Sequence, residues 1–393
     1  MKYEFKTVAN RENTATFKTD ADMVKSMFDL PYYEDTISMW IADMDFACAP
    51  EITEAIIKRA STGVFGYSGA TDEYYEALIK WHARRHQMTL KKEWLVHSHG
   101  TIAAIRNSIR ALTKEGDGII IQTPAYGPFG REIRNNNRMV LNNPLIRNEQ
   151  NEYSIDFEDF ESQCQKPNTK LFIFCNPHNP MGTVWTESEV ARLMEITAKH
   201  DVLFLSDEIH MDLMRQDATF VSALNVPHNE NCIVLTSLNK TFNVPALHAT
   251  TVIIPNETLR TTFKSYTGLT PISPLTVAAA VVAYNECETW VDELKVVLDE
   301  NMLEIKTFVE ANLPKVKYNV SDGTYFAWLD FSAYGLSDQA LVQKCAHEAH
   351  LIVESGEMFG SDKAGFIRMN TATPKTVIQE VLQRLDRVFN SKR

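Results

Sequence analysis

The sequence predicts an α/β protein with a large domain built on a mostly parallel sheet and a smaller α+β domain at the C-terminal end. From about residue 51 to residue 283, short apolar runs alternate with helical patterns, which is typical of parallel strands joined by crossover helices. The chain has 393 residues, more than one ordinary hydrophobic core holds. After Pro274 the pattern changes to a long amphipathic stretch and then to shorter strands.

The strands of the large domain are predicted from apolar runs that end at polar positions. We expect them at residues 118–122, 171–175, 202–206, 232–236 and 251–255. Helices separate several of these runs. Thr186 and Glu189 form a capping-box pattern that opens a helix reaching His200, and Gly100 opens a helix that ends near Thr113. Both fit crossover helices.

The change of pattern near residue 285 predicts a domain boundary. We expect an N-terminal segment at 1–45 that packs on the small domain, a large domain at 46–285 and a small domain at 286–393. In the small domain, residues 324–331 and 365–371 are strand candidates. A last helix begins at Pro374, because proline is favoured in the first turn of a helix.

Composition limits the function classes. The net charge of -12 argues against a general nucleic-acid surface, which needs clustered Lys and Arg. No run of about 18 apolar residues predicts a membrane span, and the N-terminus lacks the apolar core of a secretory signal, so we expect a cytoplasmic protein. The six cysteines are widely spread and form no CxxC pair, which favours reduced packing residues over a disulfide framework or a metal site.

Chemically active residues follow four of the predicted strands. In a parallel sheet, ligand-binding residues gather just past the carboxyl ends of the strands. We therefore expect one site from the residues in these positions, which are Tyr126 after the first strand, Asn179 after the second, Asp207 and His210 after the third, and Ser237 and Lys240 after the fourth.

Lys240 and Asp207 are the two charged residues of this set. A lysine at the end of a buried strand can attack a carbonyl as a neutral amine, because desolvation and neighbouring cations lower its pKa. A single lysine is more often a solvated surface charge. A buried Asp207 needs a partner, and a protonated pyridine nitrogen is one. The alternative for Asp207 is a helix N-cap.

The other candidate cofactor-binding residues also have purely structural alternatives. Asn179 and His210 could donate to a phenolic oxygen of a cofactor ring, or they could be a turn residue and a satisfied loop histidine. Tyr126 lies between Pro and Gly residues that would fix its loop, so its ring could stack on a cofactor or simply pack. Gly100 opens a helix whose free amides could hold a phosphate.

These residues, in this order, resemble the fold-type I pyridoxal-phosphate enzymes of the aminotransferase class I and II family over essentially the whole chain. The spacing is specific, with 28 positions from Asn179 to Asp207 (207 - 179) and 33 from Asp207 to Lys240 (240 - 207). Within the family the sequence resembles the MalY/PatB group of cystathionine β-lyases. This likeness is carried by WIADMDF (40–46), FGY (65–67), PAYGPF, NPHNPMG, SDEIH and NKTFN.

The resemblance implies a seven-stranded, mostly parallel sheet and pyridoxal 5′-phosphate as cofactor. Lys240 would carry the cofactor as a Schiff base, Asp207 would contact the pyridine nitrogen, and Tyr126 would stack on the ring. Asn179 and His210 would lie near the ring oxygen. The implied phosphate contacts are Gly100, Thr101, Ile102 and Ser237.

The resemblance also implies how an amino-acid substrate is bound. Arg368 would hold the substrate α-carboxylate as a bidentate fork, with Asn179 nearby. Tyr67 would reach into the site of the neighbouring subunit and take part in catalysis there, so the functional unit would be a homodimer.

Two positions depart from the family pattern. Asn239 stands before Lys240 where relatives usually carry a phosphate-binding Ser, and His248 stands where typical aminotransferases carry a phosphate-binding Arg. Residues 244–246 also replace a segment that more often contains Gly. We therefore expect backbone amides to carry more of the phosphate binding.

The predicted activity is C–S β-lyase chemistry. Once displaced from the cofactor by the substrate amino group, Lys240 would remove the α proton, and a sulfur leaving group on the β carbon would depart as thiol, leaving pyruvate and ammonia. If the proton returns to the cofactor instead, the product is a keto acid and the protein is an aminotransferase. A third hypothesis is a cofactor-bearing regulatory protein that binds a transcription factor.

Overall fold

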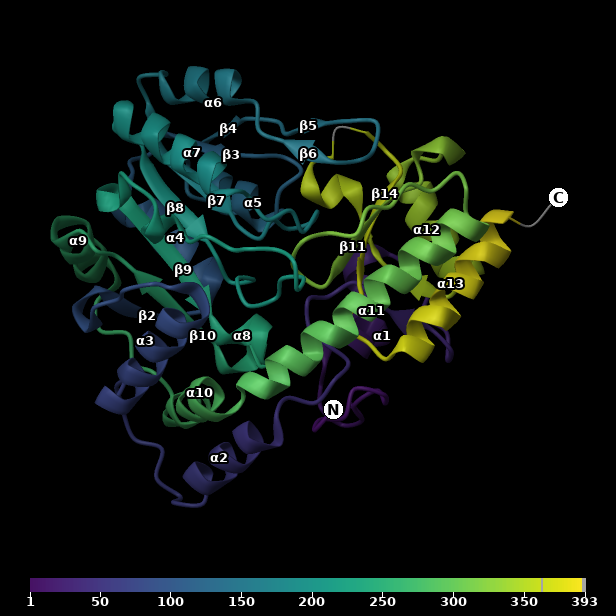
Figure 1. Cartoon of the computed structure of the whole chain (residues 1–393), viewed down its shortest axis with the longest axis horizontal. Helices are drawn as coiled ribbons and strands as arrows, with labels where there is room; N and C mark the ends of the chain where they lie inside the picture. Colours follow the sequence, from purple (N-terminus) through teal and green to yellow (C-terminus); the bar gives the residue numbers. More distant parts are fainter. Residues whose placement is uncertain (362, 391–393) are drawn as a thin grey trace.

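The central element of the fold is a seven-stranded sheet in the order β2-β10-β9-β8-β7-β3-β4 (Figure 1). The structure is a computed structural model that describes residues 1–361 and 363–390. The strands are β2 (Leu95–His99), β10 (Ala249–Ile253), β9 (Cys232–Ser237), β8 (Leu203–Asp207), β7 (Thr169–Cys175), β3 (Gly118–Ile121) and β4 (Met139–Asn142). β10 pairs antiparallel with both β2 and β9, and the other strand pairs of the sheet are parallel. The predicted α/β class and mostly parallel sheet are confirmed.

Helices cover both faces of this sheet because side chains alternate along each strand. In β7, Leu171 and Ile173 join an apolar cluster on one face, whereas Phe172 and Phe174 join the cluster on the other. The first cluster includes residues of α4 (Thr101–Leu112), α5 (Pro128–Asn135) and α9 (Glu257–Thr267). The second includes residues of α2 (Pro50–Ala60), α3 (Asp72–His86), α6 (Phe157–Cys164), α7 (Glu187–Lys199) and α10 (Pro274–Glu286). The predicted capping box of Thr186 and Glu189 is present at the start of α7.

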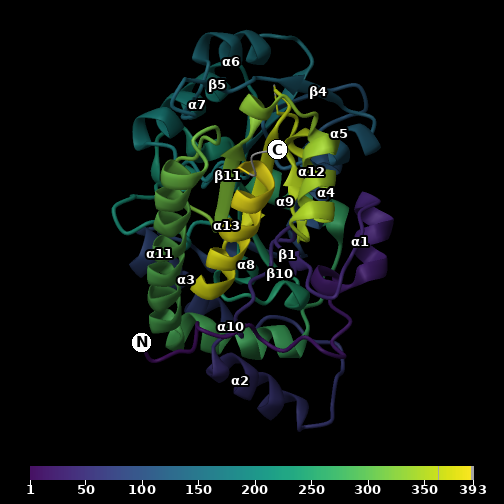
Figure 2. The ribbon, with the colours of Figure 1, turned by 90° about the vertical axis from the view of Figure 1, so that its right-hand side faces the viewer.

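The C-terminal part of the chain has its own apolar cluster. This part of the chain contains α11 (Glu288–Asn312), α12 (Asp338–Glu348) and α13 (Lys375–Asn390). It also contains an antiparallel sheet in the order β11-β14-β13, formed by Phe326–Asp330, Phe366–Asn370 and Glu354–Ser355. Figure 2 shows α11 and α13 side by side, and their residues are in contact. Helices packed on a small antiparallel sheet give the predicted α+β arrangement.

The N-terminal residues connect these two parts. β1 (Ile37–Ser38) pairs in parallel with β12 (Leu351–Ile352), and Trp40 belongs to the same apolar cluster as Ala346. The remaining elements are α1 (Ala21–Phe28), β5 (Ile146–Arg147), β6 (Tyr153–Ser154) and α8 (Leu238–Thr241), with short 3-10 helices at Phe17–Thr19, Lys92–Trp94, Ala223–Asn225, Asn229–Asn231, Pro245–Leu247, Ser332–Tyr334 and Gly356–Phe359. The domain boundaries at 45/46 and 285/286 stay predictions. Residues 362 and 391–393 of the predicted small domain lie outside the described residues.

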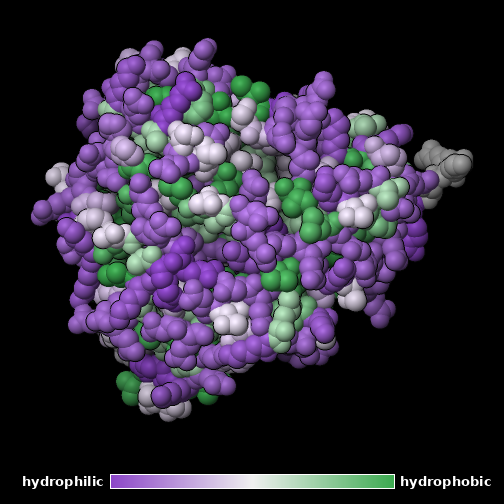
Figure 3. Space-filling model, viewed as in Figure 1, coloured by the Kyte–Doolittle hydropathy of each residue, from purple (hydrophilic) through white to green (hydrophobic). Residues whose placement is uncertain are grey.

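The surface and the cysteines agree with the composition. Hydrophilic residues dominate the face in Figure 3, with scattered hydrophobic ones. All six cysteines are free, and five of them are buried. In the described part of the chain no helix is long and apolar enough to cross a membrane, and no group of three or more His, Cys, Asp or Glu is arranged to hold a metal.

Candidate active site

A cavity of about 340 Å³ lies at the carboxyl ends of β7, β8 and β9. Its lining includes nine of the residues that the sequence analysis selected, namely Gly100, Thr101, Ile102, Tyr126, Asn179, Asp207, His210, Ser237 and Lys240. A second cavity, of about 590 Å³, contains Arg368 and shares Tyr126 and Lys240 with the first. The two cavities therefore meet at the Lys240 side chain.

Lys240 lies on α8, directly after β9. Its Nζ donates to the carbonyl oxygen of Ala42 at 2.8 Å. Burial of the amine and the nearby Arg368 guanidinium lower the pKa of Lys240 to about 8. At a pH near 8, roughly half of this lysine is therefore the neutral, nucleophilic amine.

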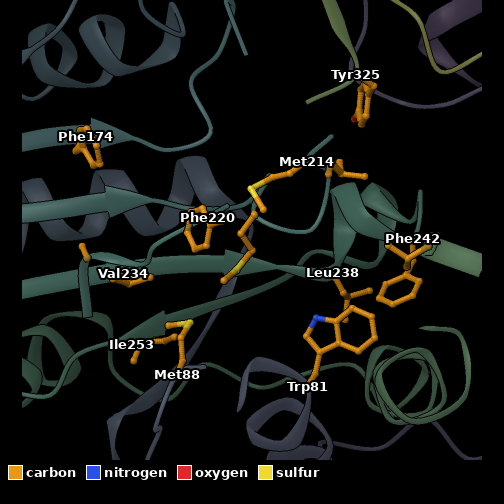
Figure 4. Packing of buried hydrophobic residues seen from close by; sticks show 14 of the residues in the cluster. Trp81, Met88, Phe174, Met214, Phe220, Val234, Leu238, Phe242, Ile253 and Tyr325 are labelled. Carbon is orange, nitrogen blue, oxygen red and sulfur yellow. The ribbon is translucent and has the colours of Figure 1, made fainter. Parts of the chain in front are cut away.

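Buried polar groups around Asp212 stabilise the position of α8. Thr241 donates to Asp212 Oδ2 at 2.7 Å, and His86 Nε2 lies 2.7 Å from Asp212 Oδ1. Burial alone would raise the pKa of Asp212, but the contacts with His86 and Thr241 hold it at about 2, so the carboxylate is ionised. Figure 4 shows the apolar packing of α8 and its surroundings, with Trp81 beneath Leu238 and Phe242. The position of Lys240 is fixed by both kinds of contact.

Asp207 ends β8 and is 3% exposed. Its carboxylate accepts one hydrogen bond, from the Ile209 amide at 3.4 Å, and burial raises the pKa of Asp207 to about 7. No described helix begins directly after Asp207, so the alternative of a helix N-cap is wrong. A buried carboxyl group with so few donors fits a cationic ring nitrogen as its partner.

His210 lines the same cavity and is buried. Its Nδ1 has no hydrogen-bond partner among the described residues, and burial, with Lys240 and Arg368 nearby, holds its pKa well below the usual range. The ring packs edge-on against Tyr325 and Phe326. A buried, neutral imidazole that lines the cavity and has an unused nitrogen fits a ligand that offers a hydrogen-bonding group.

The first turn of α4 offers unused backbone amides to the cavity. Gly100 caps this helix with φ 109°, a conformation that suits glycine, and contributes no side-chain cap. The hydroxyl of Ser237 donates to the Ala249 carbonyl at 2.8 Å, and the Asn239 side chain accepts from the Ala249 amide at 3.2 Å. Asn239 and His248 both line the cavity. Because the Ser237 hydroxyl already donates to backbone, the helix amides are better placed than Ser237 to donate to a phosphate.

Arg368 lies on β14 and is 3% exposed. Its guanidinium packs over the ring of Phe326, 4.0 Å from the centroid, and donates to Asn179 Oδ1 at 2.7 Å and to the Trp40 carbonyl at 3.2 Å. It also forms an ion pair with Glu354. Arg368 is thus brought beside Asn179, as the sequence analysis expects of two substrate-binding residues.

Tyr67 is the one predicted site residue that the folded chain does not bring to either cavity. It lies between α2 and α3 and its side chain is fully exposed, at 103% relative accessibility. Val64 and Phe65 beside it are also exposed. Its predicted place in the site of a neighbouring subunit stays a prediction.

Three residues of the site escaped the sequence analysis. Ala42 accepts hydrogen bonds through its carbonyl from both Lys240 and the Tyr325 hydroxyl, the latter at 3.0 Å. Trp40 and Glu354 contact Arg368. Ala42 and Trp40 belong to the WIADMDF run, whose likeness to the family was the available signal, whereas Glu354 has no signal because cross-strand pairing is not visible in the sequence.

Comparisons with known proteins show the family of the chain. The family model for aminotransferase class I and II matches residues 34–385. Cystathionine β-lyase PatB from Bacillus subtilis is 36% identical over 356 residues, covering 89% of this chain and 92% of PatB. The protein MalY from Escherichia coli is 31% identical over 384 residues, covering 96% of both chains.

Solved structures give the same result. The crystal structure of cystalysin from Treponema denticola, which contains a pyridoxal 5′-phosphate cofactor, is 33% identical and covers 99% of each chain with a TM-score of 0.95. The PLP-bound C–S lyase from Staphylococcus hominis is 33% identical, with a TM-score of 0.92 over 99% of this chain and 98% of that one. This chain belongs to the aminotransferase class I and II family, and within it to the group that contains PatB and MalY.

Proposed function

We propose that this protein is a pyridoxal-phosphate-dependent C–S β-lyase that acts on cysteine S-conjugates such as cystathionine. In the overall reaction, one thioether amino acid and one water give one thiol, one pyruvate and one ammonium ion. The observation that carries the proposal is the meeting of the two cavities at Lys240, between Asp207 on one side and Arg368 on the other. The choice of lyase chemistry is supported by the similarity to PatB and to C–S lyases of known structure.

The residues of the first cavity fit the cofactor. The amides at the start of α4, with Gly100, would hold the phosphate, Tyr126 would stack on the ring, and Asp207 would contact the ring nitrogen. When bound, pyridoxal 5′-phosphate supplies an electron-accepting ring that stores the charge left when the α proton of the substrate departs.

Lys240 has the chemistry of both the attachment point and the base. Its Nζ is held toward the junction of the cavities by Ala42, and a pKa near 8 leaves enough neutral amine to accept a proton at Nζ. Asp207, as a carboxylate, would hold the proton on the ring nitrogen. Arg368 would bind the α-carboxylate and so present the α carbon to Lys240.

The function is tested by incubating the purified holoenzyme with cystathionine. We expect thiol and pyruvate to appear in equal amounts without an added keto acid. A parallel assay supplies a keto acid and measures amino transfer. Thiol without pyruvate would exclude the elimination, and amino transfer without thiol would make the protein an aminotransferase.

We also propose that the functional unit is a homodimer that shares its active sites. Apolar side chains are unusually exposed near the ends of α2 and α9, including Ile57 at 62%, Phe65 at 60% and Leu269 at 93%. A groove of about 540 Å³ between α2 and α10 adjoins this region. Exposed apolar surface of this kind is typical of a subunit interface, and a twofold pairing would carry Tyr67 away from its own chain.

Shared sites predict complementation between two inactive variants. Y67F and K240A should each lose activity alone, because each removes a residue from every site. In a randomly mixed preparation, hybrid dimers contain one site with both residues intact, so we expect about a quarter of the wild-type activity to return. The measurement is thiol release after co-expression of the two chains. No recovery would show that Tyr67 does not act across the interface, and an active Y67F would remove its catalytic role.

A further inference from the structure

The guanidinium of Arg368 is already engaged with the protein. Of its five N–H groups, one on Nη1 donates to Asn179, and the two on Nη2 donate to the Trp40 carbonyl and the Glu354 carboxylate. The Nε–H is buried and has no partner among the described residues. The free donors are thus Nε–H and one N–H of Nη1.

A carboxylate binds an arginine in bidentate fashion through two parallel N–H groups on one edge of the guanidinium. One edge is formed by Nη1 and Nη2, and the other by Nε and Nη2. Both edges include Nη2, whose two N–H groups are taken by Trp40 and Glu354. A bidentate α-carboxylate therefore has to displace one of these two acceptors.

The Trp40 carbonyl is the harder one to move. The residue before it, Met39, is hydrogen-bonded through both of its backbone groups. Met39 N donates to the Ile352 carbonyl and Asn370 N donates to the Met39 carbonyl, each at 2.8 Å. Glu354 approaches through a side chain with rotatable bonds, and the cavity of about 590 Å³ that it lines leaves room for another rotamer. Its charge also repels an incoming carboxylate. We therefore expect the α-carboxylate to displace Glu354 from Arg368, and not the Trp40 carbonyl.

We propose that Glu354 is a resident competitor on Arg368, which the α-carboxylate of a ligand has to displace, and that it thereby lowers the affinity of the site for carboxylate ligands, the product pyruvate included. The proposal rests on the proposed role of Arg368 as the carboxylate site. Glu354 stands directly opposite Arg368 in the pairing of β13 with β14, so the register of the sheet keeps the two side chains close together.

This competition has a consequence for the reaction. Every ligand that binds Arg368 through a carboxylate, whether an amino acid or a keto acid, bears the same cost of displacing Glu354. An aminotransferase has to bind a keto acid as its second substrate. Weak keto-acid binding therefore favours release of pyruvate and disfavours amino transfer.

The test uses propionate, a carboxylate that has neither an amino nor a keto group and does not react. We expect E354Q, which keeps the shape of the side chain and removes the charge, to bind propionate to the holoenzyme about tenfold more tightly than wild type, as measured by isothermal titration. Pyruvate should inhibit thiol release more strongly in the same variant. The matched control is E357Q, because Glu357 is exposed and takes part in none of the hydrogen bonds or ion pairs described for Arg368. Its propionate affinity should equal that of wild type.

The outcomes separate this proposal from the proposed function. If R368K weakens propionate binding but E354Q leaves it unchanged or weaker, Arg368 is the carboxylate site and Glu354 is not a competitor. If R368K does not weaken propionate binding, Arg368 is not the carboxylate site. E354A serves as a second variant, since it too removes the charge, and a tightening in both variants supports the proposal.

Discussion

Replacing Lys240 by alanine is expected to lower the rate of thiol release from cystathionine by roughly 10³-fold or more, because one substitution removes both the attachment point of the cofactor and the proton acceptor. The geometry leaves no substitute, since among the described residues lining the two cavities Lys240 is the only lysine. The measurement is kcat with saturating substrate and added pyridoxal 5′-phosphate.

The control for K240A is K264A. Lys264 is an exposed lysine near the end of α9, outside both cavities, and its replacement should leave the rate unchanged. A K240A rate within tenfold of wild type would mean that another amine carries the cofactor.

Replacing Asp207 by asparagine is expected to lower kcat by about 10²- to 10³-fold. Asparagine preserves the size of the side chain and its contact with the Ile209 amide, but it has no charge to hold a proton on the ring nitrogen. The ring then accepts less of the charge that forms when the α proton leaves. The effect should fall on kcat more than on KM, because it concerns the transition state and not the binding of the substrate.

A matched control for D207N lies near the start of the same strand. Asp201 is exposed and has φ 54°, a left-handed conformation that asparagine tolerates well. D201N removes the same charge and should keep full activity. If D207N kept full activity as well, Asp207 would not be the partner of the ring nitrogen.

Much of the large domain was predictable because its strands are buried on both faces. Runs such as 171–175 and 232–236 are continuously apolar, and the observed β7 and β9 differ from them by no more than two residues at either end. β2 and β4 were not predicted. β2 includes His97 and His99 in a run of only five residues, and β4 is a half-exposed edge strand. Neither one has the continuous apolar pattern on which the prediction depended.

The site was predictable where its residues follow strands of the sheet. Asp207, Asn179 and Lys240 converge because the carboxyl ends of parallel strands meet at one edge. The arrangement around Arg368 was not predictable, since it depends on a cross-strand partner, Glu354, and on the backbone of Trp40 more than 300 residues away in sequence. The expected bidentate fork of Arg368 is accordingly more constrained than the sequence alone implies.

The attachment of the cofactor to Lys240 is measured directly by reduction of the holoenzyme with borohydride followed by peptide mapping. Reduction fixes the cofactor to the amine that carries it, and mass spectrometry then locates the pyridoxyl label. We expect the label on Lys240 in wild type and its absence from K240A. A label on any other lysine would contradict the assignment of Lys240, and with it the position of the active site at the junction of the two cavities.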